Sequence, residues 1–134
     1  MTHRFLTALG LVLALAACSS KGQTTSTTSA PTAQQAGDFT ISTKFSPDPP
    51  KQGPETIIIG LKDASGNPVK GATVTIGTTM PSMSMSGPTL TAGDNGDGTY
   101  SAQTNLNYVT SWTFDVRVKA GAKTGRVSVK VDIK

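Results

Sequence analysis

The 134-residue sequence predicts an all-β protein, an antiparallel β-sandwich of about seven strands, preceded by a signal peptide and a flexible linker. After residue 37, short β-branched and aromatic runs alternate with clusters of Gly, Pro, Asn and Asp. Several of these runs alternate strictly between apolar and polar residues, which directs one face of each strand into a core. No window beyond the N-terminal segment shows a helical period. Residues 38–134 are therefore predicted to form one domain with a single modest core.

Proline content and apolar patterning indicate where the strands lie. The first strand ends at the proline-rich run 46–50, because proline cannot donate to a sheet ladder. Residues 57–59 are three consecutive isoleucines, a pattern typical of a central strand. The last two strands alternate strictly and are predicted to form a hairpin that turns at residues 121–125. In chain order, the predicted strands cover residues 39–45, 56–62, 72–78, 89–91, 99–104, 112–119 and 127–133.

Two turn segments indicate which kind of sandwich this is. Residues 63–74 resemble the D-x-x-G-x-P-V-x-G-A-x-V connection that is common in bacterial immunoglobulin-like domains. Residues 94–100 resemble the D-N-G-D-G-T-Y sequence that leads into a later strand of such domains. In both segments Gly, Pro and Asx residues set the turn geometry. The predicted fold is therefore an immunoglobulin-like β-sandwich.

The second turn segment also has an alternative interpretation as a calcium loop. Asp94, Asn95 and Asp97 offer oxygen ligands, but the closing glutamate and flanking helices of an EF-hand are missing. We favour the turn, because these residue types are selected for turn geometry alone. Tyr100 is then predicted to be a core or corner residue. Trp112, which opens a strictly alternating strand, is predicted to lie in the core.

The N-terminal segment has the features of an export signal. Arg4 precedes an apolar run, residues 5–17, which is too short to span a bilayer as a helix. The run ends in Leu-Ala-Ala-Cys, which resembles the bacterial lipobox, so residues 1–17 are predicted to be removed and Cys18 to carry lipid, including palmitate. The alternative is an ordinary secretory signal with a chance cysteine. Ser19 matches the sorting rule for outer-membrane lipoproteins.

The segment from the lipidated cysteine to the domain is predicted to be a flexible linker. Residues 18–37 are rich in Ser, Thr, Gln and Ala and contain no large apolar side chain. Such a composition cannot bury enough surface to offset the entropy of ordering. The predicted protein is therefore exported and held on a membrane by its lipid. It would lie at the outer membrane facing the periplasm, or at the cell surface.

Removal of the signal restricts the chemistry that remains. His3 leaves with the signal and Cys18 is lipidated, so the mature chain would hold no imidazole and no free thiol. This excludes Ser-His-Asp and Cys-His catalysis, disulfides, and metal sites that need those ligands. Arg4 is one of 12 basic residues, and 8 acidic residues oppose them, so the mature charge is a mild +3. The basic residues are scattered, and we expect neither an enzyme nor a nucleic-acid-binding protein.

The three methionines of the mature chain fall within residues 80–85. A thioether is a soft ligand that suits Cu(I). Met83 and Met85 would share a face in an extended chain, whereas Met80 would point away unless Pro81 bends the backbone. The spacing therefore permits a Cu(I) site formed by Met80, Met83 and Met85, and no other cofactor is expected.

Methionine also has a structural interpretation. It fills gaps in cores and is common on adaptable binding surfaces. In this alternative, Met80 packs inside while Met83 and Met85 face a protein partner. Two function classes therefore stay open: a copper-handling accessory protein, and a non-catalytic interaction module of the cell envelope without metal.

Three segments resemble the YtkA-like family, whose relatives include FixH-like proteins. They are the Met-Pro-x-Met-x-Met stretch at 80–85, the Gly-Thr-Tyr lead-in at 98–100, and the strand 112–118. The resemblance covers most of residues 39–131. It implies an exported or membrane-anchored immunoglobulin-like domain, of a kind sometimes found beside copper-handling or metal-efflux components. One departure is residues 107–111, where the family often has a methionine and a glycine; a possible extra thioether ligand is missing there.

Overall fold

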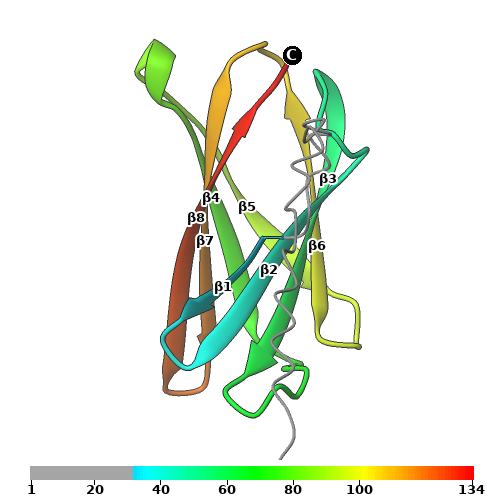
Figure 1. Cartoon of the computed structure of the whole chain (residues 1–134), viewed down its shortest axis with the longest axis vertical. Coiled ribbons are helices and arrows are strands. Elements are labelled where there is room, and N and C mark those ends of the chain that lie inside the picture. Colours follow the sequence, from blue (N-terminus) through cyan, green and yellow to red (C-terminus); the bar gives the residue numbers. More distant parts are fainter. Residues whose placement is uncertain (1–31) are drawn as a thin grey trace, which may run out of the picture.

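The computed structural model describes residues 32–134, which form eight β-strands and one short 3-10 helix (Figure 1). The predicted all-β sandwich is confirmed. None of the helical segments among these residues is long and apolar enough to cross a membrane. The elements are β1 (Thr32–Ala36), β2 (Phe39–Ser46), β3 (Gly53–Asp63), β4 (Thr73–Met80), η1 (Pro81–Met83), β5 (Met85–Asp94), β6 (Thr99–Leu106), β7 (Ser111–Ala120) and β8 (Lys123–Asp132).

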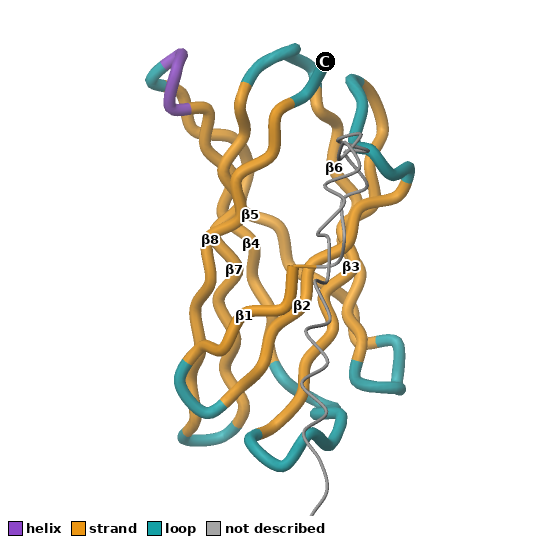
Figure 2. Tube along the Cα trace, viewed as in Figure 1, coloured by secondary structure: helices purple, strands orange, loops and turns teal. Residues whose placement is uncertain are grey.

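The strands form one antiparallel sheet that bends into two layers. Its order is β1-β2-β3-β6-β5-β4-β7-β8. Strand β5 connects the two layers. It pairs with β4 over most of its length, and with β6 only through Gly93 and Asp94. Figures 1 and 2 show the result, with β2, β3 and β6 in one layer and β4, β7 and β8 in the other.

The ordered domain begins before the predicted boundary at Asp38. Strand β1 lies within residues 18–37, which composition assigned to the linker, and it pairs with β2 from Thr32 opposite Thr43 to Ala36 opposite Phe39. It is an edge strand in which Ala36 supplies the buried hydrophobic contact. Its sequence is mostly polar and shows no pattern typical of a strand. Backbone hydrogen bonds to β2 hold it in the sheet. The predicted signal 1–17, Cys18 and the rest of the linker lie outside the described residues.

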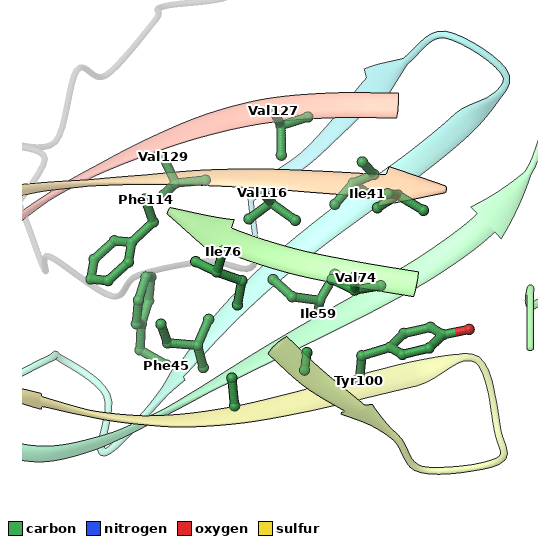
Figure 3. Packing of buried hydrophobic residues seen from close by; sticks show 14 of the residues in the cluster. Ile41, Phe45, Ile59, Val74, Ile76, Tyr100, Phe114, Val116, Val127 and Val129 are labelled. Atoms are coloured by element: carbon green, nitrogen blue, oxygen red, sulfur yellow. The ribbon is translucent and has the colours of Figure 1, made fainter. Parts of the chain in front are cut away.

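The core follows from the alternation predicted for the strands. On β3, Ile57, Ile59 and Leu61 point inward between partly exposed neighbours. Phe45 of β2 meets Phe114 of β7 from the opposite layer, with 5.3 Å between ring centroids (Figure 3). Burying each such side chain contributes about 1.5–3 kcal/mol to folding. The eight strands among the described residues all pack around this one core, so we expect residues 32–134 to fold as a unit.

Tyr100 ties β6 to the loop between β3 and β4. Its ring is fully buried in the core. Its hydroxyl donates to the carbonyl of Val69 at 2.8 Å and accepts from the amide of Ala72 at 3.0 Å. A buried hydroxyl is costly unless it is paired, and here it pairs on both sides. The prediction of a core or corner tyrosine is therefore confirmed.

The carboxylates of the Asp94–Thr99 turn accept hydrogen bonds from backbone amides. Asp94 accepts from the amide of Gly96 at 2.7 Å and from that of Gly71 at 2.6 Å, so it also binds the β3–β4 loop. Asp97 accepts from the amide of Thr99 at 2.9 Å. The Gly96 and Gly71 amides lower the pKa of Asp94. These contacts support the interpretation of this segment as a structural turn.

We expect Tyr100→Phe to lower the free energy of unfolding of residues 32–134 by about 1–3 kcal/mol, because it leaves the Val69 carbonyl and the Ala72 amide without their partner. Urea unfolding measures the change. Tyr108→Phe is the matched control, since Tyr108 is 43% exposed, and it should change stability by less than about 0.5 kcal/mol. Equal effects of the two variants would contradict the role given to the Tyr100 hydroxyl.

Candidate functional site

The methionines lie on the hairpin between β4 and β5. Met80 ends β4, Pro81 to Met83 form the 3-10 turn η1, and Met85 begins β5 (Figure 2). Pro81 occupies the start of the turn, and Ser84 returns the chain in the left-handed region, with φ 52°. The backbone therefore bends at the position where the sequence required a bend for Met80 to join the other methionines.

The strand register brings Met80 and Met85 opposite each other. Directly opposed residues of an antiparallel pair project from the same face of the hairpin. Met83 stands in the turn between them rather than in an extended strand, so the expected two-residue repeat of Met83 and Met85 does not apply. Met80 is 2% exposed, whereas Met83 and Met85 are each 42% exposed. One thioether thus comes from the core and two lie at the surface.

The base of the hairpin is fixed on the sheet beneath it. Thr78 is buried, and its hydroxyl donates to the carbonyl of Pro88 at 2.8 Å. Gly87 lies against Thr78 and Trp112; a Cβ at this position would collide with the Thr78 hydroxyl and stand 3.6 Å from the Trp112 ring. Trp112 is 3% exposed, as predicted for a core residue. The absence of a side chain at Gly87 therefore lets β5 pack closely over β4 and β7.

The β6–β7 loop packs beside the hairpin. Ser82 and Thr110 share a hydrogen bond of 2.6 Å between their hydroxyls, and the indole of Trp112 donates to the carbonyl of Tyr108 at 3.0 Å. Tyr108 is 43% and Val109 59% exposed. The large hydrophobic side chains that the described residues expose all belong to these two neighbouring segments. We call them the hydrophobic rim: Met83, Met85, Tyr108 and Val109.

Sequence reasoning did not identify Tyr108 and Val109 as part of the site. They stand in a connection between strands, where no periodicity tells an inward from an outward side chain. The available signal was their position just before Trp112, in the stretch where the YtkA-like family often carries a methionine. The structure places that stretch beside the methionine hairpin through the Ser82–Thr110 contact.

Glu55 is a second feature that the sequence did not reveal. Glu55 points inward on β3 and is 2% exposed. Neither carboxylate oxygen has a hydrogen-bond partner. Burial raises the pKa of Glu55. The domain therefore holds a carboxylate that is unfavourable in its ionised form.

The donor set of the hairpin can be stated for the part of the chain that the structure describes. No group of three or more His, Cys, Asp or Glu side chains gathers there as a metal-ligating cluster. The soft groups that the hairpin itself offers are the thioethers of Met80, Met83 and Met85. These ligands fit Cu(I) rather than a hard cation such as Ca²⁺ or Mg²⁺.

The antiparallel sandwich defines an immunoglobulin-like module with a methionine-containing hairpin at one end. The YtkA-like family model matches residues 33–117, and the chain belongs to this family. Among solved structures, a DUF4426 family protein from Pseudomonas aeruginosa PAO1 has the same fold, with a TM-score of 0.55 at 15% identity. The match covers 76% of this chain and 96% of that one. No curated protein matches the chain by sequence.

The raised pKa of Glu55 predicts a pH-dependent gain in stability for Glu55→Gln. Because the folded pKa is raised, the carboxylate makes folding less favourable as pH rises above the ordinary value of 4.5. Glutamine does not titrate, so the variant should unfold at a higher urea concentration than the parent at pH 7. As pH falls through the raised folded pKa toward the ordinary value of 4.5, the parent carboxylate becomes protonated and the difference should vanish. Urea unfolding at pH 7 and at pH 4 measures both points.

Asp94→Asn provides a control of opposite sign. The folded pKa of Asp94 is lowered by backbone amides, so its ionised form stabilises the fold above the unfolded pKa, and that contribution is lost as pH falls through the folded value. This variant should therefore be less stable than the parent at pH 7. A Glu55→Gln protein that is destabilised at pH 7 would contradict an unfavourable buried charge.

Proposed function

We propose that the hairpin end of this domain binds Cu(I) through Met80, Met83 and Met85, and that the protein is a non-catalytic copper-handling accessory of the cell envelope. The observation that carries the proposal is the register of Met80 opposite Met85, with Met83 in the turn between them. Cross-strand Cβ atoms lie about 4.5–5.5 Å apart. Methionine side chains have three rotatable bonds, so thioethers at this spacing can converge on one ion.

The different exposures of the three side chains suit a carrier. Met80 would supply a ligand from the core, where its position is restricted by packing. The exposed Met83 and Met85 would let the ion enter and leave by ligand exchange with an acceptor. Thioethers bind without losing a proton, so Cu(I) affinity should vary little with pH, unlike that of a thiolate or imidazole site.

Titration of residues 32–134 with Cu(I) against a competing chelator tests the proposed site. We expect the parent to bind one ion with sub-micromolar affinity, which corresponds to more than about 8 kcal/mol. The Met80→Leu/Met83→Leu/Met85→Leu variant should lose this binding, because leucine has similar volume but no sulfur. Leu-for-Met substitution in a core usually costs less than about 1.5 kcal/mol, so the variant should remain folded.

Val109→Leu is the matched control, since it alters the hydrophobic rim and leaves every thioether in place. It should bind Cu(I) as the parent does. Single Met83→Leu and Met85→Leu variants should each weaken binding, which would separate a shared site from one dominated by a single sulfur. If the triple variant binds as tightly as the parent, the thioether site is wrong.

A second candidate function is protein docking without metal, and the exposure of Tyr108 and Val109 favours it. These two side chains carry no soft ligand, yet they extend the exposed hydrophobic surface beyond the methionines. Contiguous exposed hydrophobic groups are typical of interaction sites. A photo-crosslinker at Val109 distinguishes the two: metal-free docking predicts a partner that is still captured in the triple Met→Leu variant. A copper-dependent contact predicts that this capture is lost.

We also propose that the protein is a lipoprotein attached through Cys18. This rests on the apolar run 5–17 and the Leu-Ala-Ala-Cys sequence at its end. Metabolic labelling with an alkyne analogue of palmitate should label the full chain expressed in a bacterium, whereas Cys18→Ser should show no label and keep its signal. Labelling that persists in Cys18→Ser would contradict the anchor.

A further inference from the structure

A second surface, away from the methionine hairpin, concentrates positive charge. It lies on the outward side of β4, β7 and β8, at the end of the domain where the β1–β2 and β7–β8 turns lie (Figure 1). The strand registers arrange its side chains in two adjacent rows. These rows are Thr75, Arg117 and Arg126, and Thr73, Lys119 and Thr124.

The β1–β2 turn forms one wall of this surface because two glycines allow it to come close. A Cβ at Gly37 would stand 2.9 Å from the carbonyl oxygen of Thr124, and a Cβ at Gly125 would stand 2.8 Å from that of Ala36. Both distances are shorter than real Cβ contacts, so only glycine permits this packing. Together the turn and the rows border an open groove of about 530 Å³, a volume within the usual range for small-molecule sites.

The charges of the groove are not balanced within the domain. Arg117 stands directly opposite Arg126, an arrangement of like charges that is destabilising between strands. The ion pair found among residues 32–134 joins Arg126 to Asp115 at 3.3 Å. The Asp115 carboxylate also accepts from Ser128, and these partners lower the pKa of Asp115. Three cations line the groove, Arg117, Lys119 and Arg126, and this ion pair engages one of them.

We propose that this groove binds the phosphate group of an anionic ligand, either a soluble phosphate ester or a phospholipid headgroup. Guanidinium groups match phosphate oxygens with paired hydrogen bonds, and the strand register places two arginines opposite each other on this face. The hydroxyls of Thr73, Thr75 and Thr124 provide further donors along the same rows. A bound anion would also relieve the repulsion between Arg117 and Arg126.

The test is an NMR titration of ¹⁵N-labelled residues 32–134 with inorganic phosphate and with glycerol phosphate at constant ionic strength. We expect saturable shifts at the amides of Thr75, Arg117 and Arg126. Arg117→Gln/Arg126→Gln should weaken binding at least tenfold. Lys44→Gln/Lys62→Gln removes the same charge from exposed positions on β2 and β3 and should change affinity less than twofold.

Two further variants and a vesicle assay complete the test. Thr75→Val keeps the charge and removes one hydroxyl, so it should weaken binding about threefold without the charge loss of the arginine variant. Unchanged Trp112 fluorescence would show that each variant is folded. Co-sedimentation with phosphatidylglycerol vesicles, but not phosphatidylcholine vesicles, identifies a headgroup as the source, and binding of glycerol phosphate alone identifies a soluble ester. The proposal is overturned if neither binds, or if the two lysine substitutions weaken binding as much as the two arginine substitutions.

Discussion

The paired hydroxyl of Tyr100 is the interaction on which the arrangement of the domain depends. It holds the β3–β4 loop against β6 from within the core, next to the point where Gly93 and Asp94 carry β5 onto β6. Asp94 binds the same loop through the Gly71 amide. The two layers are thus joined through polar contacts at this end. At the other end, β4 and β5 extend into the methionine hairpin, which contacts the β6–β7 loop.

The methionines of the hairpin differ in exposure because the hairpin extends beyond the core. Met80 is buried because it is the last inward-facing residue of β4, whereas Met83 lies in the turn that follows and is exposed. Thr78 and Trp112 secure the base of the hairpin, and the Ser82–Thr110 contact places the β6–β7 loop alongside. The methionine hairpin is thereby fixed to one end of the sandwich, where exposed hydrophobic side chains border it. The combination supports both a metal carrier and a surface that a partner could contact.

Strands with regular patterns were predictable from sequence, and segments set by tertiary contacts were not. The alternation over residues 112–119 predicted β7 closely, because half of the strand faces the core. The alternation over residues 127–133 identified β8, but this strand begins at Lys123, within the predicted turn 121–125. Strand β1 was missed, since backbone pairing with β2 holds a polar sequence. The methionines were singled out by type and spacing. Their relative placement depended on the turn at Pro81 and on the β4–β5 register, neither of which composition specifies. The inward orientation of Glu55 likewise depends on the register of β3.

The central claim is that sulfur from the hairpin surrounds the metal. X-ray absorption at the copper K edge of Cu(I)-loaded residues 32–134 addresses it directly, because sulfur and lighter ligands scatter differently. The account predicts a first coordination shell dominated by sulfur in the parent. It also predicts that this shell is lost when Met80, Met83 and Met85 are replaced by leucine. A first shell of nitrogen and oxygen in the parent would contradict it.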